Sequence, residues 1–447
     1  MIPRITLFGA GKSASHFILH FYQKALKGQC SLHILDGNLD NVKKLIEPFD
    51  SVFFTEMNLS LTENYPTIIS ESDIVVSLLP PVFHVPIAKI CVELKKNLVT
   101  ASYVSEEMNQ LDKAAKEAGI ILMNECGADP GLDHLSAIKL FREIESKGGI
   151  ITGFLSSTGG LIADASDNNP WKYKFTWNPR NVVLAGSAGT AIFFEGDEIK
   201  LTPYHRLFGA AEEMDLGANG VFESYTNRNS LPYKSLYQLH HVKSLKRGTL
   251  RKKGFCAAWN VLVQLGYTDD VVKIKRYNSK TWRQLTSNFV SGYTINDLEE
   301  ALLTNPSFQC DKEALEKIQW LGLLEDAALP DFEEASPAYL LQCLLESKWK
   351  LETNDKDLLV MAHQINYEMR GKLFELKSNL VLEGEDAVFT AMSKTVGLTA
   401  AWVTEAILEG IFKLPGVHIP TDYQLATFVL NALATQGITF DESVKEC

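Results

Sequence analysis

Short apolar runs alternate with amphipathic stretches along the first 127 residues. Each run is apolar at nearly every position, which is typical of strands that are buried on both faces of a parallel sheet. In the stretches between them, apolar residues recur every three or four positions, as in an α-helix. The predicted strands are Ile5–Phe8, Leu32–Leu35, Val52–Phe54, Ile74–Leu79, Leu98–Thr100 and Ile120–Met123. This alternation predicts an α/β fold with a parallel sheet of the Rossmann type.

The pattern changes in the rest of the chain. Residues 269–350 are charged and have the spacing of helices, so we expect an all-helical insertion there. Leu358–Tyr367 and Lys372–Leu382 predict two strands of a β-hairpin, which would rejoin the sheet of a middle α/β domain. Residues 387–412 are rich in Ala and Leu and predict a pair of helices with a break near Gly397.

A glycine loop follows the first strand. It reads Gly9-Ala10-Gly11-Lys12-Ser13-Ala14, a G-x-G-x-x-A string that opens a helix. The first glycine allows a tight turn, and the second lets the backbone approach a pyrophosphate at the positive end of the helix. Asp36 ends the second strand, where an acid accepts hydrogen bonds from an adenosine ribose. The alternative is an ordinary βα turn with a surface Asp36. Other residues just past strand ends, which would face adenine or nicotinamide, are Asn58, Leu79 and Pro80.

Two polar residues follow the last two strands of this half. Tyr103 and Asp129 stand where an open α/β sheet places its ligand, which makes them candidates for catalysis. Alternatively, Asp129 caps the helix that begins at Leu132, and Tyr103 is a half-buried core residue. His84 and His134 lie within amphipathic helices, so we expect packing or capping from them rather than chemistry.

Composition narrows the class of protein. The length of 447 residues suggests about three domains, and 46% hydrophobic with 22% charged residues suits a globular protein with a full core. A net charge of −12 argues against nucleic acid as a partner. No apolar run is long enough to span a bilayer, and no signal peptide is recognised. The seven cysteines are scattered, so neither disulfides nor a metal site is expected, and Cys126 is interpreted as a small buried hydrophobe. A cytoplasmic protein fits these features.

Several longer strings carry a resemblance to a known family. They are ASYVS (101–105), MNECGADPGLDH (123–134), SSTGG (156–160), KFTWNPR (174–180), NRNS (227–230), RGTLRKKGF (247–255), AMSKTVG (391–397) and GVHIP (416–420). In these strings the sequence resembles the saccharopine dehydrogenases of the L-glutamate-forming type, also called saccharopine reductases. The resemblance covers essentially the whole chain. It is less specific for the substrate, since related enzymes act on carboxynorspermidine and on lysine with oxoglutarate.

The resemblance implies an oxidoreductase of lysine metabolism, a homodimer and a fold of three parts. The chain would then divide into a Rossmann NAD(P)-binding domain at 1–127, an α/β substrate-binding and dimerisation domain at 128–268 and 351–386, the helical insertion at 269–350, and C-terminal helices at 387–447 that could pack back on the first domain. The reaction interconverts saccharopine with L-glutamate and L-2-aminoadipate 6-semialdehyde by hydride transfer at a CH–NH bond.

The resemblance also implies site residues. The cofactor contacts are expected at Gly9, Ala10, Gly11, Lys12, Ser13, Asp36, Asn58, Leu59, Leu79, Pro80, Ala128, Asp129, Pro130 and Pro179. The substrate contacts are expected at Ser102, Tyr103, Asp129, Arg228, Leu250, Arg251 and Lys252.

Three departures from the family strings matter. Members that use NADP have Arg just past the second strand, whereas this chain has Asp36-Gly37, which would repel a 2′-phosphate. We therefore expect NAD to be preferred, with NADP possible. Asn229 replaces an aspartate of the family, so it cannot orient Arg228 by charge. Cys126-Gly127-Ala128 replaces bulkier residues beside the nicotinamide.

The chemistry explains why such residues are needed. Saccharopine carries three carboxylates, which arginine holds well through charge-assisted hydrogen bonds, and Arg228 and Arg251 are the candidates. Proton transfer needs a group within hydrogen-bond reach of the reacting nitrogen or water, and Asp129 is the first candidate, with Tyr103 second. Three alternatives remain open: a carboxynorspermidine-type reductase, a dinucleotide-binding sensor without turnover, and a family mechanism that relies on water and positioning alone. The arginines could also be ordinary surface residues.

Overall fold

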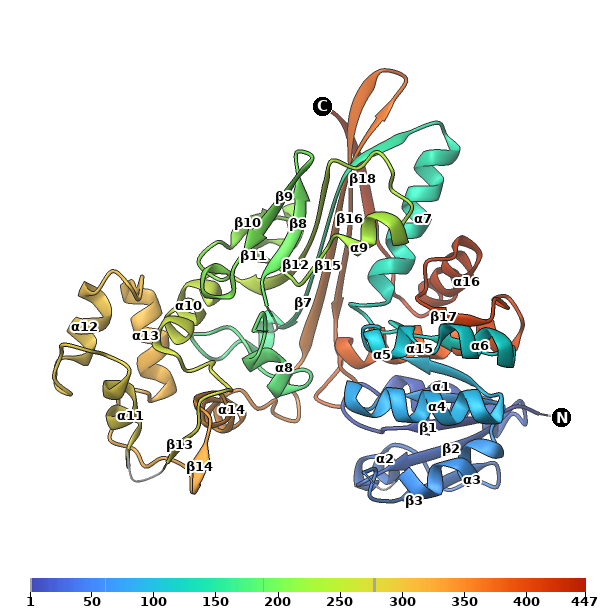
Figure 1. The fold of residues 1–447 in the computed structure, drawn as a ribbon, viewed down its shortest axis with the longest axis horizontal. Coiled ribbons are helices and arrows are strands. Elements are labelled where there is room, and N and C mark those ends of the chain that lie inside the picture. Colours follow the sequence, from blue (N-terminus) through green and yellow to red (C-terminus); the bar gives the residue numbers. More distant parts are fainter. Residues whose placement is uncertain (1, 61, 188, 276–278) are drawn as a thin grey trace. The chain divides into compact units, whose positions relative to one another are not determined.

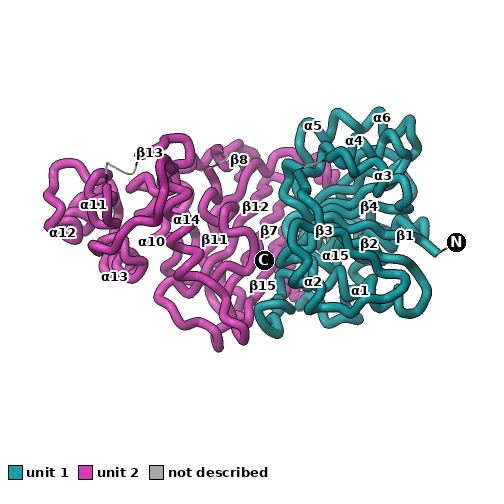
Figure 2. Tube along the Cα trace, turned by 90° about the horizontal axis from the view of Figure 1, so that it is seen from below, with its two compact units in different colours: residues 1–150, 382–441 teal, residues 151–381, 442–447 magenta. Residues whose placement is uncertain are grey.

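The structure is a computed structural model that describes residues 2–60, 62–187, 189–275 and 279–447. The chain forms two compact units, shown in different colours in Figure 2. Unit 1 consists of Met1–Ile150 and Leu382–Asp441, and unit 2 consists of Ile151–Val381 and Glu442–Cys447.

Unit 1 is built on a parallel sheet with helices on both faces (Figure 1). The strand order is β17-β6-β5-β4-β1-β2-β3. The strands are β1 (Arg4–Phe8), β2 (Ser31–Asp36), β3 (Val52–Glu56), β4 (Ile74–Ser77), β5 (Asn97–Thr100), β6 (Ile121–Met123) and β17 (Gly416–His418). The order reverses direction between β1 and β4, which is the position where such sheets bind ligands. The α/β fold class is therefore confirmed, and β17 adds a strand that the sequence pattern did not predict.

The helices of unit 1 cover this sheet. They are α1 (Ser15–Leu26), α2 (Asp40–Leu45), α3 (Tyr65–Ser70), α4 (His84–Leu94), α5 (Glu106–Asn109), α6 (Asp112–Ala118), α7 (Leu132–Ser146), α15 (Ala391–Leu408) and α16 (Tyr423–Ala434), with short 3₁₀ turns at Thr62–Asn64 and Pro81–Phe83. Tyr65, Ile87 and Ala115 of the helices pack on Val75 and Leu98 of the strands in one core cluster. All four residues of β4 are buried, which explains its apolar sequence.

Helix α15 is continuous through Gly397, so the predicted break there is wrong. A Cβ at Gly397 would lie 2.8 Å from the backbone nitrogen of Phe17. The glycine therefore permits α15 to pack closely on α1. Further along the same contact, Glu405 of α15 lies beside His20 and Lys24 of α1. This C-terminal helix is therefore part of unit 1 and packs on the first helix of its parallel sheet.

The observed boundary between the units differs from the predicted one at residue 127. Helix α7 belongs to unit 1, because it packs against α16 and α15 of the C-terminal segment. Sequence periodicity shows that α7 is amphipathic but not which partner buries its apolar face.

Unit 2 contains a larger mixed sheet with the order β10-β11-β12-β7-β15-β16-β18. In addition, β8 pairs with β12, and β9 pairs with β8. Its strands are β7 (Ile150–Ile162), β8 (Ala191–Glu195), β9 (Glu198–Thr202), β10 (Glu212–Asp215), β11 (Val221–Thr226), β12 (Ser244–Lys252), β15 (Asp357–Met369), β16 (Lys372–Glu383) and β18 (Asp441–Glu446). The predicted hairpin is present as β15 and β16. It turns at Arg370 and Gly371, both of which have positive φ.

The remaining elements of unit 2 are mostly helical. They are α8 (Pro179–Val183), α9 (Pro232–Leu236), α10 (Phe255–Leu265), α11 (Trp282–Asn288), α12 (Leu298–Thr304), α13 (Lys312–Leu321) and α14 (Pro337–Lys348), with 3₁₀ turns at Asp164–Ser166, Tyr204–Arg206 and Gly217–Asn219. The segment 269–350 is not entirely helical, because β13 (Ile274–Lys275) and β14 (Glu334–Ala335) pair within it. Strands of only two residues are too short to produce an alternating pattern of apolar and polar residues in the sequence.

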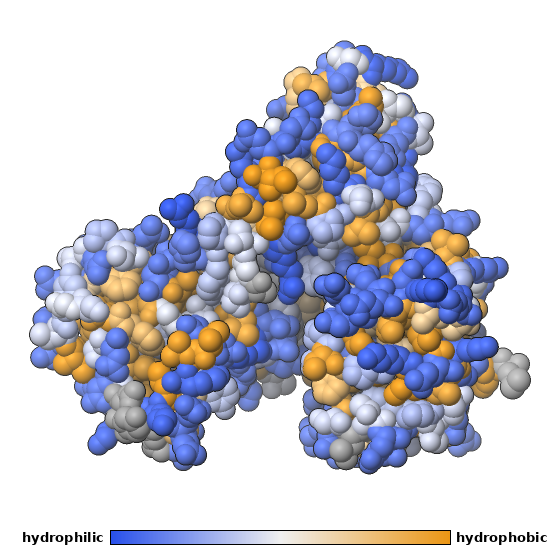
Figure 3. Space-filling model, in the orientation of Figure 1, coloured by the Kyte–Doolittle hydropathy of each residue, from blue (hydrophilic) through white to orange (hydrophobic). Residues whose placement is uncertain are grey.

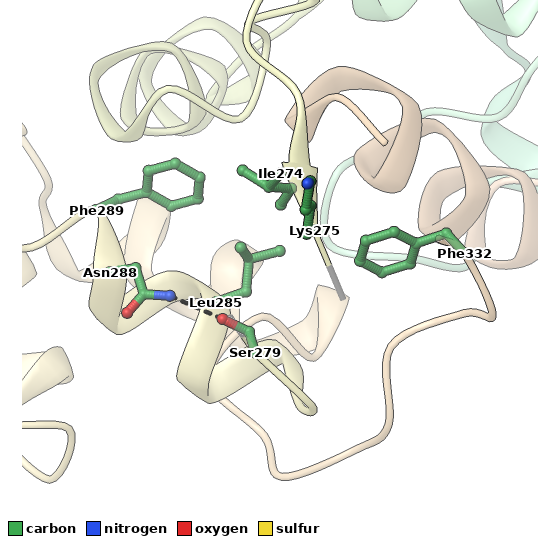
Figure 4. A pocket seen from close by; sticks show the side chains of 7 residues that line it. All are labelled: Ile274, Lys275, Ser279, Leu285, Asn288, Phe289 and Phe332. Carbon is green, nitrogen blue, oxygen red and sulfur yellow. Dashed lines mark hydrogen bonds between the residues drawn. The ribbon is translucent and has the colours of Figure 1, made fainter. Parts of the chain in front are cut away.

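A pocket of about 460 Å³ lies in this helical part (Figure 4). Its described lining residues are Ile274, Lys275, Ser279, Leu285, Asn288, Phe289 and Phe332. Lys275 is their one charged member, and they include no arginine, histidine or carboxylate, so none of the residues that the sequence predicts to bind anions or transfer protons lines this pocket. In the described part of the chain, no helix is long and apolar enough to cross a membrane, and no cluster of three or more His, Cys, Asp or Glu could hold a metal ion.

Candidate active site

The glycine loop of unit 1 joins β1 to α1, as predicted. Gly9 has φ +96, and a Cβ there would lie 2.9 Å from Leu79 Cδ2, so this position requires glycine. A Cβ at Gly11 would meet no protein atom within 4 Å. The loop thus leaves open space beside the start of a twelve-residue helix, which fits the approach of a pyrophosphate.

Asp36 stands at the end of β2, beside this loop. Its Oδ2 accepts a hydrogen bond of 2.6 Å from the Ala10 N–H, and its Oδ1 accepts one of 3.0 Å from the Asn38 N–H. The carboxylate is therefore fixed by two peptide groups and is half-buried. Each oxygen keeps a second lone pair, so Asp36 can still accept hydrogen bonds from a ribose. An ordinary surface aspartate would not be held by two backbone N–H groups in this way, so the alternative of a surface Asp36 does not fit the structure.

The other predicted cofactor residues of unit 1 also follow strand ends of its sheet. Asn58 and Leu59 follow β3, and Leu79 and Pro80 follow β4. Leu79 is buried, and Leu59 packs partly buried in the core cluster of this face, whereas Asn58 and Pro80 are exposed. Ala128, Asp129 and Pro130 follow β6. Because parallel strands end at one edge of a sheet, all these positions share the edge that carries the glycine loop.

Tyr103 and Asp129 are in direct contact. The Tyr103 hydroxyl donates a hydrogen bond of 3.0 Å to Asp129 Oδ1, and both residues are half-buried. Asp129 is not the N-cap residue of α7, since that position is Gly131, whose N–H donates to Asp133 Oδ1 over 2.6 Å. The helix-cap alternative for Asp129 is thus wrong. A carboxylate and a phenol held together at the ligand-binding edge can pass a proton between a substrate and solvent.

Ser102, a predicted substrate residue, is held by His84. His84 Nε2 lies 2.8 Å from Ser102 Oγ, and its Nδ1 lies 3.0 Å from Ser77 Oγ. Burial lowers the pKa of His84 to about 4, so the ring is neutral near pH 7. Its contacts link the end of β4 to the loop after β5. Sequence periodicity assigned His84 to packing and gave no signal for this bridge.

Cys126 and Glu125 lie between β6 and Asp129, and both are buried. Burial, with the nearby Glu125 carboxylate, raises the pKa of Cys126, so the thiol is inert, as the sequence interpretation of a small hydrophobe implies. Glu125 was missed by sequence reasoning. An acid two residues after a fully apolar strand, in the longest family-like string, is the signal that could have found it.

Unit 2 holds the predicted arginines. Arg251 on β12 is 3% exposed, and its guanidinium lies 5.2–5.7 Å from the ring centres of Tyr173, Tyr225 and Phe255. Nη1 donates to the Leu250 carbonyl over 2.9 Å and Nη2 donates to the Tyr225 hydroxyl over 3.3 Å, whereas Nε has no hydrogen-bond partner in the described part of the chain. Within the described residues, no carboxylate forms a salt bridge with this cation. A buried cation without a counter-ion is poised to bind an anion. The surface alternative for Arg251 is wrong.

Other predicted substrate residues of unit 2 have different surroundings. Arg228 is exposed in the loop after β11 and has φ +53. Lys252 forms salt bridges with Asp164 at 2.6 Å and Asp167 at 3.4 Å, so its charge is already neutralised. Leu250 is buried in a core cluster, and its carbonyl accepts the hydrogen bond from Arg251 Nη1. Pro179 is the first residue of α8, where Asn178 caps the helix.

Comparisons with known proteins identify the family. The model for the saccharopine dehydrogenase NADP binding domain matches residues 5–123, and the model for the saccharopine dehydrogenase C-terminal domain matches residues 127–438. The chain belongs to the saccharopine dehydrogenase family. The resemblance inferred from the sequence strings is thereby confirmed. The chain is an oxidoreductase of this family, with a domain for a nicotinamide dinucleotide.

Curated relatives extend this finding. The chain is 33% identical over 386 residues to the saccharopine dehydrogenase [NADP(+), L-glutamate-forming] of Pyricularia oryzae, an alignment that covers 84% of this chain and 85% of the relative. It is 32% identical to the mitochondrial alpha-aminoadipic semialdehyde synthase of Rattus norvegicus, where the match covers 84% of this chain and 41% of the longer relative. These names specify NADP for the fungal relative, not the NAD that Asp36 predicts.

A solved structure has the same fold. The apo saccharopine dehydrogenase (L-Glu forming) of Saccharomyces cerevisiae superposes with a TM-score of 0.87 at 28% identity and covers 99% of this chain and all of that one. A homospermidine synthase of Legionella pneumophila shares the fold at a TM-score of 0.56 and 10% identity.

Proposed function

We propose that this chain interconverts saccharopine with L-glutamate and L-2-aminoadipate 6-semialdehyde in lysine metabolism. The observation that carries this proposal is the hydrogen-bonded pair of Tyr103 and Asp129 at the ligand-binding edge of the dinucleotide-binding sheet. The activities in the names of the aligned relatives support the same substrate. The sensor alternative is disfavoured, because it gives no role to such a pair.

The reaction requires a hydride acceptor and a path for protons. A nicotinamide dinucleotide held at the glycine loop and Asp36 would supply the acceptor for the hydride that leaves the ε-carbon of the lysine part. Water then adds to the carbon–nitrogen double bond of the oxidised substrate, and the carbon–nitrogen bond breaks to release glutamate and the aldehyde. Asp129 takes the proton from the attacking water and returns one to the departing nitrogen, and Tyr103 orients the carboxylate and stabilises its charge.

The carboxylates of saccharopine need cationic partners. Arg251 supplies a rigid one, because the rings of Tyr173, Tyr225 and Phe255 fix its guanidinium, and its buried Nε has no hydrogen-bond partner among the described residues. Arg228 supplies a second, exposed cation in the same unit. A cationic polyamine substrate would be repelled by both groups, so the carboxynorspermidine alternative is disfavoured.

We further propose a preference for NAD over NADP. The support comes from this chain's own residues, since Asp36 occupies the end of β2 and no arginine follows it before Val42. An acid at this place repels a 2′-phosphate. The family model and the fungal relatives are named for NADP, so cofactor choice is a point where this chain is proposed to depart from them.

We also propose that unit 1 binds the cofactor, that unit 2 binds the substrate carboxylates, and that the protein is a homodimer. The support for a dimer is the resemblance, the long β15–β16 hairpin and an apolar patch over the β8–β9 hairpin (Figure 3). In that patch Ile199 and Leu201 of the edge strand β9 are each more than half exposed. An exposed apolar edge strand favours association. The cytoplasmic location stays a prediction, since relatives include mitochondrial enzymes.

A comparison of substrates tests the proposed function. Purified protein is incubated with saccharopine and with carboxynorspermidine, each with NAD⁺ and with NADP⁺, and formation of reduced cofactor is followed by absorbance. We expect turnover of saccharopine and at most a trace with the polyamine. Turnover of the polyamine without turnover of saccharopine would contradict the proposal.

A further inference from the structure

We propose that Glu125 is a positioning residue that holds the Tyr103–Asp129 pair together without touching the substrate. This inference rests on the proposed function, since it assigns a role toward the same pair. Glu125 lies between β6 and Asp129 in the chain and is 5% exposed.

Glu125 contacts the residues on both sides of Tyr103. Its backbone N–H donates a hydrogen bond of 3.1 Å to the Ser102 carbonyl. Its Oε1 accepts one of 3.0 Å from the Val104 N–H. One residue thus binds the peptide groups before and after Tyr103, which fixes the direction from which the tyrosine side chain leaves the loop.

The second carboxylate oxygen reaches the segment that carries Asp129. His134 on α7 is fully buried, and its Nε2 lies 2.8 Å from Glu125 Oε2. The start of α7 is joined in turn to the Asp129 loop, because the Asp133 N–H donates to the Ala128 carbonyl over 3.1 Å. Glu125 therefore connects the loop of Tyr103 to the helix that anchors the loop of Asp129.

The backbone of Glu125 is unusual for a glutamate. Its φ is +59, in the left-handed region that glycine or asparagine adopts at lower cost. Strained backbone of this kind persists where surrounding contacts determine it, and it concentrates at functional sites. The side-chain contacts to Val104 and His134 are the ones that a glycine here would lose.

Glu125 is not itself a catalytic residue in this account. The residue is buried, and both carboxylate oxygens meet protein groups. It acts through Tyr103, and this separates the proposal from a general role in folding. A purely structural residue would lower stability and activity whatever stands at position 103.

A double-mutant cycle tests this coupling. The variants are Glu125→Ala, Tyr103→Phe and the double variant, and Glu125→Gln is the isosteric control. We expect Glu125→Ala to lower kcat for saccharopine at least tenfold in the wild-type background and less than about threefold in the Tyr103→Phe background. Binding of NADH, which measures the folded dinucleotide site, should stay unchanged. We expect Glu125→Gln to retain most activity, because its amide oxygen can still accept from Val104 and its amide nitrogen can donate to the other tautomer of His134.

Equal effects of Glu125→Ala in both backgrounds would overturn the proposal, as would wild-type kcat in Glu125→Ala. If that variant does not fold, Glu125→Asp replaces it in the same cycle, because the shorter acid cannot span both partners.

A crystal structure of the folded variant gives a second test, which needs no substrate. We expect the Tyr103 hydroxyl to lie beyond hydrogen-bond distance of Asp129, and an unchanged distance of about 3 Å would contradict the role. If wild-type protein does not turn over saccharopine, the proposed function fails, while this structural reading still decides the positioning role.

Discussion

The Tyr103 hydroxyl and the Asp129 carboxylate, from loops that follow neighbouring strands β5 and β6, share a hydrogen bond of 3.0 Å. The two residues are 26 positions apart in sequence. Their contact follows from the sheet topology, because adjacent parallel strands deliver the loops at their ends to one place. The proposed chemistry depends on this pair.

Replacement of Asp129 should therefore affect the chemical step. We expect Asp129→Asn to lower kcat for saccharopine by roughly 10²–10⁴-fold, the usual contribution of a positioned acid or base. Tyr103→Phe keeps the ring and removes the donor, so its effect should be smaller. NADH affinity and thermal melting are the controls, and both should be unchanged. Wild-type kcat in Asp129→Asn would show that water and positioning suffice without this carboxylate.

Cofactor preference should follow Asp36. We expect a higher kcat/KM with NAD⁺ than with NADP⁺. Asp36→Ala should reduce this difference in kcat/KM, chiefly by lowering KM for NADP⁺. A kcat/KM of the wild-type protein with NADP⁺ that equals or exceeds its kcat/KM with NAD⁺ would contradict the proposed preference. Asp40→Ala is the matched control, because this exposed acid is the first residue of α2 and lies outside the position at the end of β2.

Substrate affinity should depend on Arg251. Loss of a buried charged contact typically costs ~2–5 kcal/mol, so Arg251→Met should lower kcat/KM for saccharopine about a hundredfold or more. Methionine preserves most of the volume among the three aromatic rings, which limits the loss of packing that alanine would cause. Arg228→Ala should lower kcat/KM by less, because Arg228 is exposed and water screens its contact with a carboxylate, and Lys253→Ala, an exposed cation nearby, should have no effect. A fall in melting temperature together with weaker NADH binding would indicate a structural role instead.

Acid should weaken the contact of α15 with α1. Burial raises the pKa of Glu405, but hydrogen bonds from His20 and Lys24 outweigh burial and bring the pKa below its usual value. A group whose pKa is lower in the folded state stabilises the fold above its unfolded pKa of about 4.3, and this stabilisation is lost as pH falls through the folded pKa. Glu405→Gln should thus cost about 1–3 kcal/mol in free energy of unfolding near pH 7, and less below pH ~4. Urea titrations at several pH values measure this, with exposed Glu409→Gln as the control. A cost that does not change with pH would contradict the assignment.

The sheet and the glycine loop could be predicted from sequence because their signals are local. A strand buried on both faces is apolar at every position, and a dinucleotide loop needs glycine at fixed spacing. Partners that meet across long distances in the chain left no such signal. Gly397 looked like a helix break, although its role is to let α15 approach Phe17. Strand β17 is only three residues long and was not predicted.

The candidate site divides in the same way. Tyr103 and Asp129 were found because both follow strand ends. Glu125 and His84 were not, because their functions lie in contacts with other loops rather than in any spacing. Lys252 was predicted as a substrate contact from the resemblance, and residue type alone could not show that Asp164 and Asp167 neutralise it.

Association of two chains is a further expectation. A homodimer should sediment at about twice the chain mass of 49.8 kDa at micromolar concentration. If the β9 patch takes part, Leu201→Glu should weaken the dimer, whereas Val271→Glu, an exposed apolar residue elsewhere in unit 2, should leave it intact. A wild-type monomer would refute the dimer.

Oxidation of saccharopine by this chain should release glutamate. The most direct measurement supplies saccharopine with each oxidised cofactor and quantifies L-glutamate and reduced cofactor in the same sample. We predict that glutamate and reduced cofactor form in equal amounts, and that Asp129→Asn slows the formation of both. Reduction of the cofactor without glutamate, or no reduction with either cofactor, would contradict it.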